Sequence, residues 1–227
     1  DRDLIPILRT KFFNYPDFRI HEGDALKFDF GTILQPGQQL RIVGNLPYNI
    51  STPLIFHFLA HHHMVLDMHF MLQKEVVERL AASPGTGDYG RLSIMAQYFC
   101  KVEPLFVVGP GSFNPPPKVD SAIMRLVPYD VLPYPAKDHK TLEHVVREAF
   151  SMRRKTLRNT LKRLIDAEAL EAIGIDVTLR PERLTLAEYV RISDAVFDLK
   201  SAAADNADTD VTHSDALNND PESQDEY

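Results

Sequence analysis

The feature that most constrains the fold is a short apolar run that stops abruptly at a polar, proline-containing loop. Residues 40–43 have the composition of a buried β-strand, and the loop at residues 44–51 follows directly. Gly44 and Pro47 end the strand, so an amide, a proline and an aromatic ring arrive together at its carboxyl end. In open α/β sheets, ligands bind at this edge.

The residues of this loop suit methylation of a planar exocyclic amine. Such an amine is a poor nucleophile because its lone pair is delocalised into the ring. The Asn45 side-chain oxygen and the backbone carbonyl next to Pro47 can accept its two N–H groups, which favours a pyramidal nitrogen aimed at a methyl donor. Tyr48 can stack on the base, an interaction worth roughly 1–3 kcal/mol. The alternative is an ordinary strand-end turn, in which Asn45 satisfies the loop and Tyr48 fills a core gap.

Strands and helices alternate through the first 128 residues, which predicts an α/β fold with a doubly wound core. The helix after the loop is expected to have Ser51 or Thr52 as its N-cap. Strands are predicted at residues 18–21, 40–43, 68–73, 102–108 and 122–127, and helices from residue 4 and at 54–59, 74–82 and 92–99.

Asp24 follows the first predicted strand and so lies at the ligand-binding edge. A carboxylate there can hydrogen-bond an adenine amine or a ribose. A turn or helix-capping role for the same side chain remains equally open.

The second half of the chain is helical and rich in cations. We predict a methyltransferase-like domain at 1–128, a proline-rich linker at 129–135, a helical domain at 136–200 and a disordered acidic tail at 201–227. Residues 152–163 form a predicted helix with one apolar face, and they include six cations and no acid. A solvated helix face usually carries charges of both signs, so a face with positive charges alone favours contact with phosphates.

The distribution of charge, the cysteine content and the lack of long apolar runs limit which kinds of ligand and site this chain can have. The net charge is −7, but the tail holds eight acids and no Lys or Arg, so the remaining chain has 25 basic and 24 acidic residues, a net charge of +1. Nucleic acid must therefore bind at a local patch. Cys100, in an apolar run, is predicted to be a buried, inert thiol. The sequence shows no membrane span or leader, and His61 to His63 indicate a helix end instead of a metal site.

Taken together, the motifs closely resemble the KsgA-type ribosomal RNA adenine dimethyltransferases from residue 1 to about residue 199. The residues that carry the resemblance occur in order along the chain at 1–4, 23–25, 44–52, 70–75, 89–93, 113–121 and 153–159.

The resemblance implies a Rossmann-like S-adenosylmethionine-dependent enzyme. Its family methylates two adjacent adenines near the 3′ end of small-subunit rRNA, to N6,N6-dimethyladenosine. Asp24 and Ala25 are then expected to bind the cofactor's adenine, and Asn45 to lie between cofactor and target amine. The catalytic edge is expected to comprise Asn45, Leu46, Pro47, Tyr48 and Phe113. The expected RNA-binding residues are Lys118, Arg153, Arg154, Lys155, Arg158, Lys162 and Arg163.

The resemblance also implies a monomer that acts in the cytoplasm on the immature small ribosomal subunit, without a metal and without a membrane. The family's glycine-rich cofactor loop, first strand and ribose-binding acid precede the stretch that matches residue 1. The chain taken literally is therefore expected to bind the cofactor poorly and to be inactive. Two alternatives remain: an rRNA-binding assembly factor without catalysis, and a large-subunit rRNA methyltransferase of the macrolide-resistance type.

Overall fold

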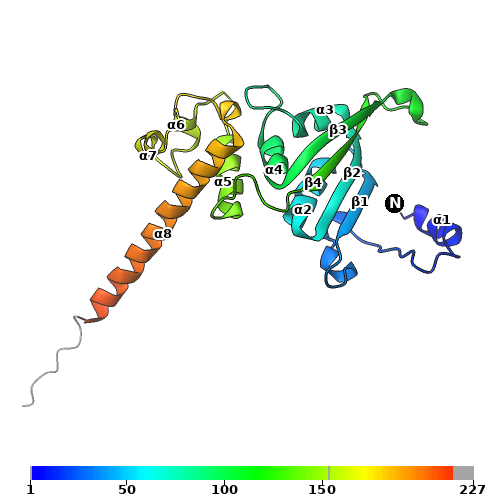
Figure 1. Cartoon of the computed structure of the whole chain (residues 1–227), viewed down its shortest axis with the longest axis horizontal. Helices are drawn as coiled ribbons and strands as arrows, with labels where there is room; N and C mark the ends of the chain where they lie inside the picture. The colour runs from blue at the N-terminus through cyan, green and yellow to red at the C-terminus, as the bar shows by residue number, and fades with distance from the viewer. Residues whose placement is uncertain (1, 153, 217–227) are drawn as a thin grey trace, which may run out of the picture.

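The computed structural model describes residues 2–152 and 154–216, and in this part of the chain a four-stranded sheet is followed by a group of helices (Figure 1). The strand order is β1-β2-β4-β3. β1 and β2 are parallel, and β4 runs antiparallel to both of its neighbours, β2 and β3. The strands are β1 (Leu40–Asn45), β2 (Val65–Gln73), β3 (Cys100–Val108) and β4 (Ser121–Pro128).

Helices cover one face of the sheet, and the apolar residues that alternate along the strands explain why. Met68, Phe70 and Leu72 of β2 are fully buried on this face, as the period of two predicts for a covered strand. The helices on this face are α2 (Ser51–Ala60), α3 (Lys74–Leu80) and α4 (Arg91–Phe99). The predicted α/β fold and the predicted strands at 68–73, 102–108 and 122–127 are therefore confirmed.

A network of charges crosses the other face of the sheet. The Asp67 carboxylate in β2 is 2% exposed and accepts hydrogen bonds from Arg41 Nε at 2.7 Å and Arg41 Nη2 at 2.9 Å. Arg125 Nη2 of β4 lies 3.4 Å from the same carboxylate, and its Nη1 lies 3.5 Å from Glu103 of β3. Asp67 thus links edge strand β1 to the centre of the sheet.

Two strand predictions near the N-terminus need correction. β1 was predicted to be buried, but it is an edge strand, and Val43 is 73% exposed because β2 is its sole partner among the described residues. Residues 18–21 form no strand, since no described strand lies beside them to accept their backbone hydrogen bonds. They follow helix α1 (Leu4–Lys11), which lies apart from the sheet in Figure 1.

The C-terminal part consists of α5 (His139–Ala149), α6 (Leu157–Thr160), α7 (Ala167–Ala172) and α8 (Leu186–Ala216), with no helix or strand at 129–135. α5 packs against α8 through a buried face that includes Leu142, Val145 and Val146. The division into domains stays a prediction.

Helix α8 extends into the predicted acidic tail, and its second half projects away from the other helices (Figure 1). The structure shows helix up to Ala216 where the sequence predicts disorder from residue 201. Residues 201–204, one serine and three alanines, have high helix propensity, so they extend a helix already nucleated by packing. Residues 217–227 of the predicted tail lie outside the described residues.

Candidate active site

The predicted loop lies at the carboxyl edge of the sheet, where β1 and β2 end together. Asn45, the last residue of β1, pairs with Met71 of β2, and the next backbone N–H, that of Leu46, donates to the Met71 carbonyl at 3.2 Å. The Leu46 side chain is buried, whereas Asn45 and Pro47 are exposed. A buried leucine therefore anchors the loop, and its polar residue faces outward.

Gly44 leaves space for this anchor. A Cβ atom at this position would lie 3.1 Å from Leu46 Cδ2, which is tighter than nine in ten Cβ contacts in proteins, so the Leu46 side chain would have to shift by a few tenths of an ångström. The glycine therefore lets the Leu46 side chain fold back against β1. This fixes the direction in which the chain leaves the strand and hence where Asn45 is presented.

The rest of the loop is a tight turn into α2. The Ile50 N–H donates to the Pro47 carbonyl at 3.1 Å, and the Ser51 hydroxyl donates to the Tyr48 carbonyl at 3.2 Å. Ile50, not Ser51 or Thr52, is the N-cap of α2. The N-cap prediction is wrong because the Ser51 hydroxyl is used to close the turn. The Asn45 side chain makes no hydrogen bond to any described residue.

The second predicted loop reaches the same edge from β3 and β4. Ser121, the first residue of β4, pairs with both Gln73 and Val108, so the intervening residues 109–120 start and end beside the carboxyl end of β2. In this loop Phe113 is half-buried and Lys118 is exposed. The Ser121 Oγ and Tyr48 Oη atoms lie 2.7 Å apart, which joins the two loops.

Asp24 has the local geometry of a helix cap. Its carboxylate accepts the Leu26 N–H at 3.0 Å and begins the 3₁₀ helix η1 (Ala25–Lys27), which packs against α2. Asp24 and Ala25 are exposed. Among the described residues, no hydrogen bond or ion pair connects Asp24 to Asn45. The structure thus shows the capping role and leaves one carboxylate oxygen without a described partner.

The basic segment is not the continuous helix predicted over 152–163. Of the residues described there, only those of α6 are helical, because the Leu157 N–H donates to the Leu179 carbonyl at 2.9 Å and the Arg158 N–H donates to the Val177 carbonyl at 3.1 Å. Arg154, with φ +71°, is also incompatible with a helix. The predicted apolar side is nevertheless buried. The cations that the structure describes here are all exposed: Arg154, Lys155, Arg158, Lys162 and Arg163. Arg153 lies outside the described residues.

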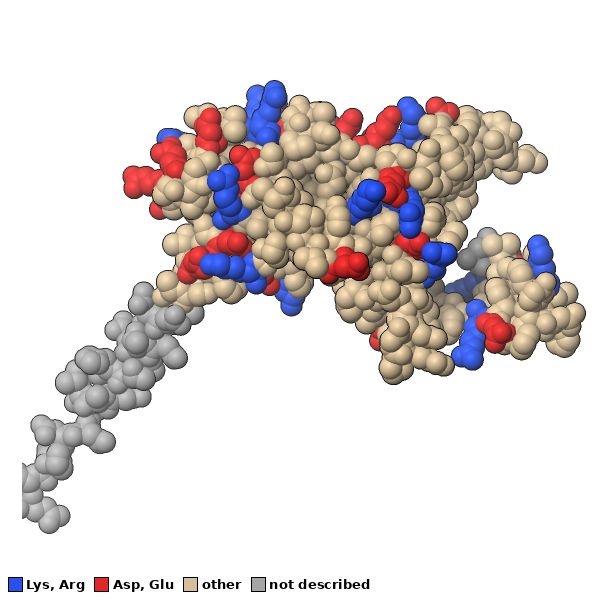
Figure 2. All heavy atoms as spheres, viewed as in Figure 1, with Lys and Arg blue, Asp and Glu red and all other residues tan. Residues whose placement is uncertain are grey.

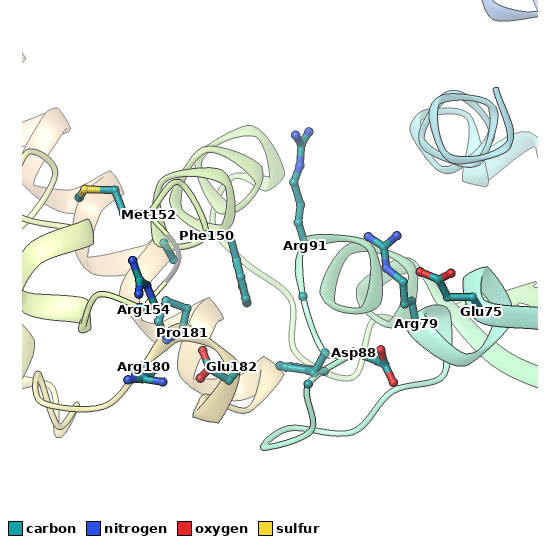
Figure 3. A pocket seen from close by; sticks show the side chains of 14 residues that line it. Glu75, Arg79, Asp88, Arg91, Phe150, Met152, Arg154, Arg180, Pro181 and Glu182 are labelled. Atoms are coloured by element: carbon teal, nitrogen blue, oxygen red, sulfur yellow. The ribbon is translucent and has the colours of Figure 1, made fainter. Parts of the chain in front are cut away.

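A cavity of about 590 Å³ separates α3 and the 87–91 segment from the loops of the helical part (Figure 3). Arg79, Arg154 and Arg180 line it and form no ion pair with a described residue. Arg91 also lines it, but its guanidinium contacts Glu143 at 2.8 Å and points away from Arg154 and Arg180. The acidic lining residues are Glu75, Asp88 and Glu182.

Sequence reasoning missed Arg79 and Arg180 as candidate RNA-binding residues. Each stands among residues of mixed charge, so no local run of cations marks it. On the face drawn in Figure 2, Lys and Arg are likewise interspersed with Asp and Glu. Only the folded chain brings these two arginines to the cavity that Arg154 also lines.

The other candidate chemistries fit the described structure less well. Cys100 is buried, as predicted, and this burial raises the pKa of its thiol to about 12, which disfavours the reactive thiolate. Helix α2 ends at Ala60, and the next histidines enter the 3₁₀ helix η3 (His62–Met64). Over the described ranges, no cluster of His, Cys, Asp or Glu is suited to hold a metal ion. Within the same ranges, no helix has the length and apolar character needed to cross a membrane.

Residues 1–198 match the family model described as ribosomal RNA adenine dimethylase. The chain is 66% identical over 202 residues to ribosomal RNA small subunit methyltransferase A of Pseudomonas putida, a match that covers 89% of this chain and 76% of that protein. The protein of the same name from Marinobacter nauticus is 66% identical over 206 residues, covering 91% and 74%.

Solved structures show the same fold. A dimethyladenosine transferase from Plasmodium falciparum superimposes with a TM-score of 0.69 at 27% identity, covering 85% of this chain and 78% of that one. The 23S rRNA methyltransferase ErmE superimposes with a TM-score of 0.62 at 24% identity, covering 86% and 79%. The second similarity concerns the fold alone.

Proposed function

Because the chain belongs to the ribosomal RNA adenine dimethylase family, we propose that it methylates the exocyclic amines of two adjacent adenines near the 3′ end of small-subunit rRNA, with S-adenosylmethionine as the methyl donor. The observation that carries this proposal is the loop at the carboxyl edge of the sheet. It presents the Asn45 amide with no hydrogen-bond partner among the described residues, next to a turn that contains the aromatic ring of Tyr48.

Two acceptors at this loop orient the target amine. The Asn45 side-chain oxygen accepts one N–H. The Pro47 carbonyl is directed at the Ile50 N–H within the turn, so we assign the other N–H to the Leu46 carbonyl, the backbone acceptor on the other side of the Leu46–Pro47 bond. Both bonds favour a pyramidal nitrogen with its lone pair exposed, and the amine loses its proton after attack. Positioning and electrostatics, without a strong general base, carry this reaction.

Two aromatic side chains hold the base. A target adenine must leave its stack to be reached, and stacking on Tyr48 and Phe113 offsets part of that cost. Both rings belong to loops at the carboxyl edge, and both residues are half-buried. The buried part of each side chain is held by the protein, and the exposed part remains available for stacking.

Asp24 and Ala25 fit the adenine of the cofactor. One carboxylate oxygen of Asp24 accepts the Leu26 N–H, and the other has no described partner and can accept an exocyclic amine. When bound, S-adenosylmethionine supplies an electrophilic methyl group. Asn45 then faces both cofactor and target, and it is the residue on which transfer depends most.

The exposed cations of the helical part, with Lys118, hold the RNA backbone. Arg154 links the predicted basic segment to the cavity, where Arg79 and Arg180 add two guanidinium groups that form no ion pair with any residue the structure describes. Unpaired cations release counterions when they meet phosphates, which favours binding. The natural partner is the immature small ribosomal subunit, which the protein binds as a monomer in the cytoplasm.

The experiment is a methylation assay on small subunits that lack this modification, with product read by primer extension. Because the chain taken literally is expected to bind the cofactor poorly, the assay and its variants use the chain with the family's N-terminal cofactor segment restored, beside the chain as given. Asn45→Ala should lower kcat at least 100-fold and leave RNA affinity within twofold, because one positioned acceptor is lost. Asn14→Ala, at an exposed asparagine outside the site, is the matched control and should retain activity. The assembly-factor alternative would be supported by a different result. In that case the protein would bind immature subunits without methylating them, and neither the methyl donor nor Asn45→Ala would change the binding.

A further inference from the structure

Ser121 occupies an unusual position for a polar side chain. It is fully buried, and it begins β4 with backbone partners on both sides, Gln73 and Val108. Immediately before it, the Asp120 carbonyl accepts the Lys74 N–H at 2.9 Å. The serine is therefore fixed to the sheet, although it borders a loop.

The Ser121 hydroxyl is used on Tyr48. Its Oγ lies 2.7 Å from Tyr48 Oη, and either oxygen can be the donor. The backbone of Tyr48 is held separately by Ser51, whose hydroxyl donates to the Tyr48 carbonyl at 3.2 Å. The tyrosine is thus held at both ends, its main chain by α2 and its ring tip by β4.

Fixing the ring tip has a specific consequence. A tyrosine side chain turns about two torsions. A bond at its hydroxyl restrains χ1, so the position of the ring is set before a ligand arrives, whereas rotation about χ2 leaves the hydroxyl oxygen in place because that oxygen lies on the χ2 axis. Stacking requires the ring to lie beside the base, so a ring that is already held in place loses less freedom when a base stacks on it.

We propose that Ser121 is a positioning residue that holds the Tyr48 ring in the place needed to stack on the target adenine. The proposal rests on the proposed function, because it assigns Tyr48 to the base. It explains why a buried hydroxyl lies at the junction of the two loops that carry Tyr48 and Phe113.

The test is a double-mutant cycle on kcat and KM for small-subunit methylation. Ser121→Ala and Tyr48→Phe remove the same hydrogen bond from opposite ends. Each should lower kcat roughly fivefold, the usual effect of one hydrogen bond. KM should change less than twofold, because distant cations dominate RNA binding. The double variant should match the single ones, and Ser121→Thr, which keeps the hydroxyl, should restore most of kcat.

Ser193→Ala is the matched control. Ser193 is equally buried, but its hydroxyl has no hydrogen-bond partner in the described part of the chain, so kcat should not change. An unchanged kcat in Ser121→Ala and Tyr48→Phe would overturn the positioning role, and so would additive losses of kcat in the double variant. In either case, methylation by the wild-type protein would still support the proposed function. Tyr48→Phe retains the whole ring, so it tests the bond even if Ser121→Ala folds poorly. A wild-type protein that binds subunits without methylating them would refute both proposals.

Discussion

Replacing Asp67 with asparagine tests whether one buried carboxylate secures the strand that carries Asn45. The carboxylate receives two hydrogen bonds from Arg41 of β1, and Arg125 lies 3.4 Å away. An asparagine has nearly the same shape but no charge, and it turns an amide toward two guanidinium groups. The substitution therefore removes the attraction without leaving a cavity.

The magnitude follows from the exposure of each partner. Removing one member of a fully buried ion pair costs about 3–5 kcal/mol. Here the acid is 2% exposed, but Arg41 is 60% exposed and Arg125 is 38% exposed, so water partly solvates the cations left behind. We expect Asp67→Asn to lower the free energy of unfolding by about 2–3 kcal/mol at pH 7, between the buried and the surface cases.

The effect should depend on pH in a defined direction. Hydrogen bonds from Arg41 lower the pKa of Asp67 below its ordinary 3.8. A group whose pKa falls on folding stabilises the protein above its unfolded-state pKa of about 3.9 and loses that contribution as pH falls through the folded value. The unfolding free energies of wild type and Asp67→Asn should therefore converge below about pH 4.

Urea unfolding at pH 7 and at several lower pH values measures both quantities. Glu103→Gln is the control, because Glu103 is a more exposed acid on the same sheet face, paired with Lys101 at 2.7 Å; it should cost much less stability than Asp67→Asn. A loss below 0.5 kcal/mol for Asp67→Asn at pH 7, or a difference from wild type that grows as pH falls, would refute the reasoning.

Three further predictions follow from single contacts. Gly44→Ala should displace the Leu46 side chain, lowering methylation more than tenfold while costing about 1 kcal/mol of stability in urea; normal activity would contradict the anchor. Cys100, whose pKa burial raises to about 12, should be alkylated at pH 8 only as the protein unfolds, as mass spectrometry would show, and rapid labelling of the native protein would contradict its burial. Arg180→Gln should weaken RNA binding and reduce the slope of log K against log salt by about 0.7–0.9; an unchanged slope would exclude phosphate contact.

Elements with a strong local pattern were predicted correctly from the sequence. β2 alternates buried and partly exposed residues, and α2 and α4 carry apolar residues at helical spacing, so each pattern reports a partner that covers one face. The loop predicted at residues 44–51 was placed nearly correctly, because Pro47 lies just beyond the strand, but β1 runs through Gly44 to Asn45, two residues past its predicted end.

The errors occur where distant backbone decides the outcome. Residues 152–163 have helical periodicity, yet two N–H groups there bond to carbonyls of Val177 and Leu179, more than 18 residues away. Residues 18–21 have the composition of a strand but no described neighbour to pair with. In both cases the local preference is weak compared with the requirement that backbone groups find partners.

The candidate site illustrates the same limit more sharply. Each of its two loops can be recognised alone in the sequence, but Tyr48 and Ser121 are 73 residues apart, and no periodicity relates them. They meet because β4 inserts antiparallel between β2 and β3, in a register that puts Ser121 opposite Gln73. A shift of one residue would turn the Ser121 side chain to the opposite face of the sheet and break the hydrogen bond. The register of β4 thus determines whether the two aromatic residues can act on one base.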